Sequence, residues 1–326
     1  MGRNDTLLSD ALVRSWLPKR SFGTQKWEVG ALAIVAGAPN FVGAPLLCAT
    51  GAARSGAGVV LLVVPRSIVG PIASRLPEAV FLPIPEGDPQ AFAAKAQELI
   101  LERFEKTRAL VIGPGLGEDQ HATALMGMVF GKISAYRAEI GFSSQMQLAN
   151  ATEEPAGIAG RDTPAVVDAD GLNWLGKQAD WWTKCKPKSL VLTPHVGEMS
   201  RLLDTEPKDI IADPVAVAKA AATKWKQTVV LKYGHSVATD GTVAYVAPDA
   251  PLSLATAGVG DVLAGMIGGL LAQGVPPLEA AATALYLGPK AARRVEQVTG
   301  SLGLLAGDLP LAVAEELRLL EDSKGA

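Results

Sequence analysis

The stretch "ALAIVAGAPNFVGAPLLCATGAARSGAGVVLLVVP", residues 31–65, holds two continuous apolar runs separated by an alanine-rich segment. The runs at 31–37 and 58–65 predict buried strands, and residues 43–56 between them predict a helix. Two strands joined through a helix pair in parallel within one sheet. This stretch therefore predicts an α/β fold.

The same alternation continues along the chain. Further strand-like runs lie at residues 109–117, 165–173, 189–195 and 228–234, with a helical run at 214–225. Two short runs around Asp240-Gly241 predict a hairpin, and residues 258 to 320 predict nearly continuous helix. Because uninterrupted apolar strands are typical of parallel sheets covered on both faces, we expect a mostly parallel central sheet in a three-layer α/β/α arrangement.

The domain organisation follows from length and pattern. The chain has 326 residues, shows no repeat and no low-complexity linker, and fits one large α/β domain. We expect an N-terminal extension over 1–26 and a single domain over 27–326. Leu8, Leu12 and Trp16 recur at helical spacing and predict a short amphipathic helix in the extension. Residues 131–163 show neither the helical nor the strand pattern of apolar residues, and we expect a loop-rich insert there.

Composition excludes several classes of partner. The formal net charge is −3, so no basic excess points to nucleic acid or a membrane surface. Cys48 and Cys185 cannot build a disulfide framework, and the first 20 residues lack the apolar stretch of a secretory signal, so we expect the cytoplasm. The apolar run after Asp261 lasts about three helical turns, and a membrane span needs about 20 residues.

Polar and glycine-rich motifs come after the predicted strands. They are "GPGLG" (113–117), "DADGLN" (168–173), "TPHVGE" (193–198), "LKYGHS" (231–236) and, opening a helix, "AGVGD" (257–261). In a parallel sheet, ligands bind beyond the carboxyl ends of the strands. We therefore expect these five motifs to converge on one rim.

The "AGVGD" motif combines glycines, a helix start and one carboxylate. Backbone amides freed by Gly258 and Gly260, with the positive end of the helix after them, suit a phosphate. Asp261 then has two interpretations: a functional carboxylate beside that phosphate, or an N-cap that stabilises the helix by about 1 kcal/mol. The motif is neither a Walker loop nor a dinucleotide fingerprint, since no Lys-Ser/Thr comes after it and no strand precedes it.

The remaining motifs offer carboxylates and one histidine. His195 and Glu198 stand three residues apart at a predicted helix start and share a face. Asp168 and Asp170 could hold a metal or a hydroxyl, or Asp170 could cap the next helix. Neither cysteine has a histidine nearby in sequence, so no zinc site or thiol nucleophile is indicated.

Taken together in chain order, these motifs resemble the ribokinase-like superfamily. Within it they are most similar to the ADP- or ATP-dependent NAD(P)H-hydrate dehydratases, over roughly residues 27–310. Many members of that family carry an epimerase domain ahead of the dehydratase, and this sequence resembles a stand-alone dehydratase without it.

The resemblance implies a role for individual positions. Asp261 matches the catalytic carboxylate at the reacting hydroxyl. Substrate contacts are implied for Ala44, Gly115, His195 and Asp261. Nucleotide contacts are implied for Lys232, Tyr233, Gly234, His235, Ser236, Gly258 and Gly260. Glu198 stands where relatives keep a glutamate near magnesium, so a metal contact is implied there.

Three motifs depart from the family pattern. The usual "GGTGD" is "AGVGD" here, which leaves the backbone amides in place. The usual "KGAGT" is "KYGHS", so Tyr233 and His235 replace small residues and are expected to reshape the nucleotide site. "HKG" becomes "QKW" at residues 25–27, which removes an expected contact.

The implied reaction is repair of hydrated NADH or NADPH. ADP or ATP with Mg²⁺ would phosphorylate the added hydroxyl, and phosphate would then leave to restore the reduced nicotinamide. Two alternatives stay open: a small-molecule kinase acting on a sugar, hydroxymethylpyrimidine or hydroxyethylthiazole, and a catalytically weak nucleotide-binding protein. We also expect a homo-oligomer.

Overall fold

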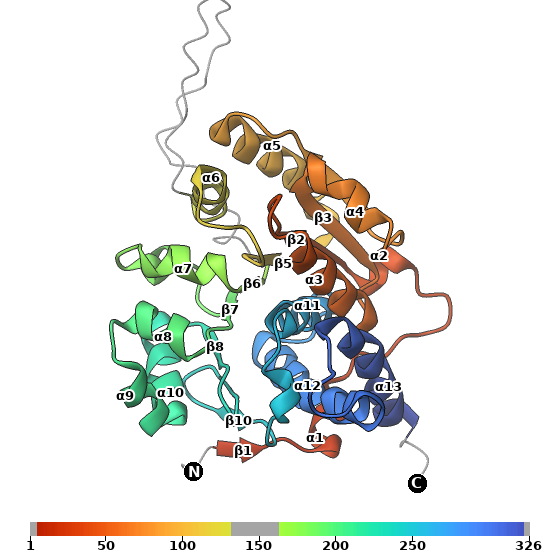
Figure 1. The fold of residues 1–326 in the computed structure, drawn as a ribbon, viewed down its shortest axis with the longest axis vertical. Coiled ribbons are helices and arrows are strands. Elements are labelled where there is room, and N and C mark those ends of the chain that lie inside the picture. Colours follow the sequence, from red (N-terminus) through yellow and green to blue (C-terminus); the bar gives the residue numbers. More distant parts are fainter. Residues whose placement is uncertain (1–4, 132–162, 323–326) are drawn as a thin grey trace, which may run out of the picture.

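The protein is built on one ten-stranded sheet (Figure 1). The computed structural model describes residues 5–131 and 163–322. The spatial order of the strands is β1-β10-β9-β8-β7-β6-β5-β2-β3-β4. In these described ranges β9 alone runs antiparallel to its neighbours. The strands are β1 Asp5–Leu7, β2 Ala31–Val35, β3 Val59–Pro65, β4 Val80–Ile84, β5 Thr107–Ile112, β6 Ala165–Val167, β7 Leu190–Leu192, β8 Thr228–Leu231, β9 Val237–Thr239 and β10 Ala244–Val246.

Helices cover both faces of the sheet, because alternate side chains of each buried strand point to opposite faces. Leu32 and Ile34 pack with one set of helices, whereas Ala33 and Val35 pack with the other. The first set is α1 Asp10–Trp16, α3 Gly43–Arg54, α4 Val69–Ala73, α11 Val259–Ala272, α12 Pro277–Thr299 and α13 Leu309–Asp322. The second is α5 Pro89–Leu101, α6 Gln120–Val129, α7 Asp170–Gly176, α8 Val196–Leu203, α9 Pro207–Ala212 and α10 Pro214–Trp225. The predicted three-layer α/β/α fold is confirmed.

Local predictions can be compared with this structure. The hairpin is confirmed: β9 and β10 pair across a turn in which Asp240 Oδ1 accepts the amides of Thr242 and Val243 at 2.9 and 3.0 Å. The short N-terminal helix is confirmed as α1, and a four-residue helix, α2 (Lys26–Val29), comes after it. The predicted loop-rich insert lies, apart from its two ends, outside the described residues.

The two edge strands, β1 and β4, escape prediction. β4 contains Pro83, which cannot donate to a ladder, and the strand is tolerated because it pairs on one side only, with β3. β1 has only three residues and pairs with β10, while Asp5 forms an ion pair with Lys219 at 3.1 Å. The described part of residues 1–26 therefore joins the sheet, and the division at residue 27 stays a prediction.

Helices α3 and α11 pack backbone against backbone. A Cβ added at Gly265 would lie 1.9 Å from the Cys48 carbonyl oxygen, so only glycine permits this approach. The contact therefore fixes α11 closely against α3. Among the described residues, no helix is long and apolar enough to cross a membrane, and α11 has only 14 residues.

Candidate active site

The carboxyl ends of β5, β6, β7 and β8 are neighbours in the sheet. The glycine turn after β5 and the acidic turn after β6 are in direct contact. Asp170 Oδ2 accepts the Gly117 amide at 2.7 Å, so Asp170 links the two turns rather than capping α7, whose N-cap is Ala169. The capping alternative for Asp170 is therefore wrong.

Ala44 and Gly115 meet at the same end of the sheet. A Cβ added at Gly115 would lie 2.7 Å from Ala44 Cβ and 2.8 Å from Phe41 Cβ. Gly115 also has φ +61°, a conformation that favours glycine. The segment after β2 and the turn after β5 are thus in contact, and Ala44 and Gly115 are two of the positions for which the family resemblance implied substrate contacts.

Asp168 is the buried centre of the rim. Its Oδ1 accepts a hydrogen bond from Thr193 Oγ1 at 2.7 Å and one from Lys232 Nζ at 2.9 Å. On the other side the Lys232 ammonium lies 3.9 Å from Glu198 Oε2. Burial disfavours the charged lysine, but the Asp168 and Glu198 carboxylates outweigh that effect and raise the pKa of Lys232.

His195 and Glu198 open α8 with reciprocal capping bonds. His195 Nδ1 accepts the amides of Gly197 and Glu198, and Glu198 Oε2 accepts the His195 amide at 2.7 Å. The imidazole is half exposed at the rim, whereas Glu198 is buried. Burial raises the pKa of Glu198 to about 7, although the nearby Lys232 ammonium opposes the shift.

Asp261 lies in the first turn of α11 and does not cap it. The N-cap is Gly258, with φ +87° and no side chain, and Asp261 is the third helical residue. The capping alternative for Asp261 is therefore wrong. Burial, and after it the Asp168 carboxylate, raises the pKa of Asp261 to about 7 against the effect of Lys232. A carboxylate with that pKa is suited to accept a proton near neutral pH.

The first turn of α11 also meets the buried ion pair. A Cβ added at Gly260 would lie 3.4 Å from Lys232 Nζ and 3.7 Å from Asp168 Oδ2. The amides of a helix's first turn have no intrahelical acceptor, and the helix dipole adds positive potential there. The first turn of α11 therefore stands beside the Lys232 ammonium, and free helix amides next to a cation are the chemistry of a phosphate site.

A pocket of about 570 Å³ opens beside this turn. Six of the predicted site residues line it, namely His195, Lys232, Tyr233, Gly234, Ser236 and Gly260. Its wall is mostly apolar and comes from residues 247–256 and from α11, α12 and α13. The volume lies within the range of small-molecule sites.

Six predicted residues lie outside that lining: Ala44, Gly115, Glu198, His235, Gly258 and Asp261. The His235 side chain is exposed and faces Asp249, with 3.0 Å between Nδ1 and Oδ1. Of the two bulky replacements in "KYGHS", Tyr233 therefore borders the pocket and His235 does not.

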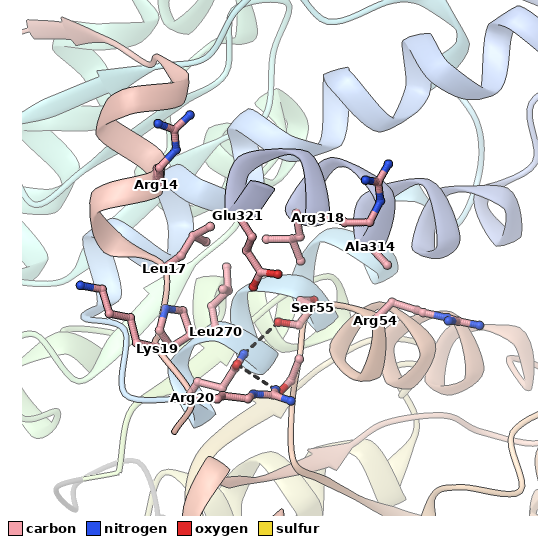
Figure 2. A pocket seen from close by; sticks show the side chains of 14 residues that line it. Arg14, Leu17, Lys19, Arg20, Arg54, Ser55, Leu270, Ala314, Arg318 and Glu321 are labelled. Atoms are coloured by element: carbon pink, nitrogen blue, oxygen red, sulfur yellow. Dashed lines mark hydrogen bonds between the residues drawn. The ribbon is translucent and has the colours of Figure 1, made fainter. Parts of the chain in front are cut away.

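A second cavity, of about 720 Å³, lies beside the residues that lead into β3 (Figure 2). Its basic lining residues are Arg14, Lys19, Arg20, Arg54 and Arg318. Arg14 Nε donates to the Leu320 carbonyl at 2.9 Å, Arg20 donates to the Gly56 carbonyl after α3, and Arg318 pairs with Asp322 at 2.7 Å. Cations at helix carboxyl ends stabilise the helices, so these contacts give Arg14, Arg20 and Arg318 a structural role.

The side chains at the rim do not form a complete cage for a resident metal. Over residues 5–131 and 163–322, no group of three or more His, Cys, Asp or Glu side chains lies where it could hold a metal ion. Lys232 supplies the positive charge between Asp168 and Glu198. Magnesium carried by a nucleotide needs only one or two protein carboxylates, and the metal contact at Glu198 stays a prediction.

Sequence reasoning missed the apolar wall and the role of Thr193. Pro248, Pro251 and Leu252 all border the pocket, and the two prolines shortly before the glycine turn are the available signal of a shaped loop. Thr193 opens the motif "TPHVGE", in which His195 and Glu198 drew the functional prediction. The structure shows that the Thr193 hydroxyl donates a hydrogen bond to Asp168.

The fold and rim define a ribokinase-like α/β protein. A ribokinase-like protein from Enterococcus faecalis shares the fold, with a TM-score of 0.78, 20% identity and 98% of each chain covered. The ADP/ATP-dependent NAD(P)H-hydrate dehydratase of Bacillus subtilis, co-crystallised with ATP and Mg²⁺, has a TM-score of 0.77 at 25% identity, covering 98% of this chain and 100% of that one.

The profile of one family, described as NAD(P)H-hydrate dehydratase, matches residues 32–136 and 145–313. The chain is 35% identical to the ADP-dependent (S)-NAD(P)H-hydrate dehydratase of Neisseria meningitidis, over 89% of this chain and 86% of that protein. It belongs to the NAD(P)H-hydrate dehydratase family. It is also 36% identical to the bifunctional NAD(P)H-hydrate repair enzyme of Salinibacter ruber over 92% of its own length, but spans only 50% of that protein.

Proposed function

We propose that this protein dehydrates hydrated NADH and NADPH in a reaction that consumes ADP or ATP. Family membership supports the substrate class. The observation that carries the chemistry is Asp261, a buried carboxylate with its pKa raised to about 7, on the helix turn that also meets Lys232. The reaction class is a lyase that works through phosphoryl transfer and repairs a damaged metabolite.

In the proposed first step, the substrate hydroxyl attacks the terminal phosphorus of the nucleotide. Asp261 accepts the hydroxyl proton, the bond from phosphorus to the bridging oxygen breaks, and the lower nucleotide leaves. First-turn amides of α11 and the Lys232 ammonium stabilise charge on the transferring group. Such electrostatic stabilisation is usually the largest contribution, and a positioned base adds about 10²–10⁴-fold.

In the second step the substrate supplies the electrons. The lone pair of the ring nitrogen pushes out phosphate as the carbon–oxygen bond breaks. The neighbouring ring carbon then loses a proton to water, which restores the reduced nicotinamide. The protein therefore needs the machinery of a kinase and no further catalytic group for the elimination.

We assign the nucleotide to the pocket beside α11, and the substrate to the surface of Ala44, Gly115 and His195. The apolar wall fits a purine base, and Lys232, Gly260 and Ser236 belong to the same lining, where we place its phosphates. Gly258 shapes the turn through its positive φ. Tyr233 and Gly234 complete the lining, whereas the surface pairing of His235 with Asp249 argues against direct contact. Magnesium enters with the nucleotide as part of the substrate.

The deciding experiment is incubation of the protein with hydrated NADH and either ADP or ATP. We expect one NADH and one free phosphate for each nucleotide consumed, measured by absorbance and phosphate release. A stable phosphorylated product from ribose, fructose phosphate, hydroxymethylpyrimidine or hydroxyethylthiazole, without activity on the hydrate, would instead establish the kinase alternative. Nucleotide binding without any turnover would establish the weak binding protein.

A homo-oligomer is part of the proposal. Val298, Leu302, Leu305 and Leu311 are all exposed in the segment that runs from the end of α12 to the start of α13, and exposed apolar side chains favour association. Light scattering on the purified protein tests this.

Two buried free cysteines, Cys48 and Cys185, suit a reducing compartment, and we propose the cytoplasm.

A further inference from the structure

Asp168 has no part in the steps above, yet it is the buried centre of the rim. The residue is 1% exposed. Its Oδ1 accepts hydrogen bonds from Thr193 and Lys232, and neither bond serves secondary structure. A buried carboxylate is costly unless it is paired and hydrogen-bonded, so its presence here calls for a reason beyond packing.

The backbone at Asp168 is held on a strained turn. Ala169, the next residue, has φ 49° and ψ −119°, a region that side chains rarely adopt. The Asp168 amide donates to the Ile112 carbonyl, and its own carbonyl accepts the Gly171 amide. A Cβ at Gly113 would lie 1.9 Å from that carbonyl oxygen. The surrounding structure therefore determines where the carboxylate stands.

The carboxylate in turn determines where the Lys232 ammonium stands. A lysine side chain is a flexible stem with a point charge. Glu198 Oε2 lies 3.9 Å from Nζ and competes for it, while the Asp168 bond, at 2.9 Å, holds Nζ beside the turn at Gly260. Without Asp168, the ammonium would be drawn toward Glu198, the other carboxylate beside it.

We propose that Asp168 is a positioning residue, which holds the Lys232 ammonium against the Gly260 turn so that this cation meets the phosphate in transfer. The inference rests on the proposed function for the identity of that phosphate. The positioning role predicts that replacing Asp168 weakens anion binding, whereas removal of a negative charge alone would strengthen it. Deleting a carboxylate near a phosphate site should strengthen anion binding, whereas losing the positioned lysine should weaken it.

The test is a double-mutant cycle with inorganic tripolyphosphate as the probe, measured by calorimetry. We expect Asp168→Asn and Lys232→Gln each to raise Kd by about tenfold or more, the order expected for a lost hydrogen bond to a charged group. The double variant should bind no more weakly than Lys232→Gln, because both changes remove one interaction. The proposal would be overturned if Asp168→Asn bound tripolyphosphate as tightly as the wild type or more tightly. It would also be overturned if the increase in Kd of the double variant equalled the product of the increases in the two single variants.

Two further variants keep the test decisive. Glu316→Gln is the matched control: Glu316 is also a buried carboxylate, it pairs with Arg294 at 2.7 Å, and it does not line the pocket. The Kd of this variant should not change. Thr193→Val loosens Asp168 without removing its charge and should weaken binding by a smaller factor, which covers the case in which Asp168→Asn does not fold. If the double-mutant cycle gave the expected Kd values but the protein did not turn over the hydrate, the proposed reaction would be refuted and the positioning role of Asp168 would stand.

Discussion

His195 and Glu198 bind each other across the first turn of α8. His195 Nδ1 accepts the Glu198 amide at 3.2 Å, and Glu198 Oε2 accepts the His195 amide at 2.7 Å. Because Nδ1 is an acceptor, the neutral ring carries its proton on Nε2. Burial, with the charges of Lys232 and Arg201, lowers the pKa of His195, so the ring is neutral at pH 7 and can donate one hydrogen bond from the rim.

Replacement of His195 should therefore affect both the substrate and the helix. We expect His195→Ala to raise KM for the hydrate with less effect on nucleotide affinity, and to lose about 1 kcal/mol of stability with the cap. His195→Asn keeps a capping oxygen and should restore the stability but not the KM. Stoichiometric zinc in the wild type that disappears in His195→Ala would show a metal ligand instead.

The general-base role of Asp261 predicts a loss of turnover without a loss of binding. Asp261→Asn is nearly isosteric, and its side chain caps nothing in the wild type. We expect kcat to fall at least about 100-fold, since base catalysis supplies that much or more. Nucleotide affinity, measured by calorimetry, should stay within a few-fold. A variant that keeps more than about a tenth of the wild-type rate contradicts the role.

The raised pKa of Asp261 predicts the pH dependence of the rate. The base is charged only above its pKa of about 7, so kcat/KM should rise with pH and level off above that value. An ordinary aspartate, with a pKa of about 4, would give a flat profile over this range. A pH–rate profile for the hydrate checks this, and nucleotide Kd measured at each pH separates the rate effect from binding.

Tyr233 and His235 form a matched pair for testing the pocket. Tyr233 is 42% exposed and borders the pocket, whereas His235 faces Asp249 at the surface. We expect Tyr233→Gly, which restores the small residue usual in the family, to change KM for ADP and ATP several-fold. His235→Ala should leave both values unchanged. An equal response of the two variants would place the nucleotide elsewhere.

The close contact of α3 and α11 predicts a large loss of stability at Gly265. A methyl group at Gly265 would clash with the Cys48 carbonyl oxygen. Gly265→Ala should therefore lower the free energy of unfolding by about 2 kcal/mol or more. Gly288 is also helical but has nothing within 4 Å of an added Cβ, so Gly288→Ala should be neutral or stabilising by up to about 1 kcal/mol. Denaturant titration of both variants checks the pair.

Periodicity and chain order are the features of the sequence that predict the fold. Continuous apolar strands such as residues 31–35 predict the covered sheet, and the rule for strand ends predicts that the motifs converge. Edge strands lack that signal, because β4 carries Pro83 and β1 has only three residues. Capping was equally beyond prediction: Asp261 and Gly258 are both acceptable N-caps, and only the backbone angles decide between them.

The pairing of side chains across the rim also could not be predicted from the sequence. Lys232 and Asp168 are 64 residues apart, and no local pattern indicates the hydrogen bond of 2.9 Å that joins them. The apolar pocket wall comes from segments on either side of the glycine turn, and its residues are individually ordinary core residues. Such features depend on tertiary packing, so they become visible only when the strands are placed.

The entry of the chain at the sheet edge has a practical consequence. β1 runs parallel to β10, which has the same direction as β8, so Asp5 lies at the amino-terminal rim, across the sheet from the candidate site. A polypeptide attached ahead of Asp5 would join the molecule on that far side. An affinity tag or surface tether that joins the molecule there should therefore leave the candidate site open to substrate.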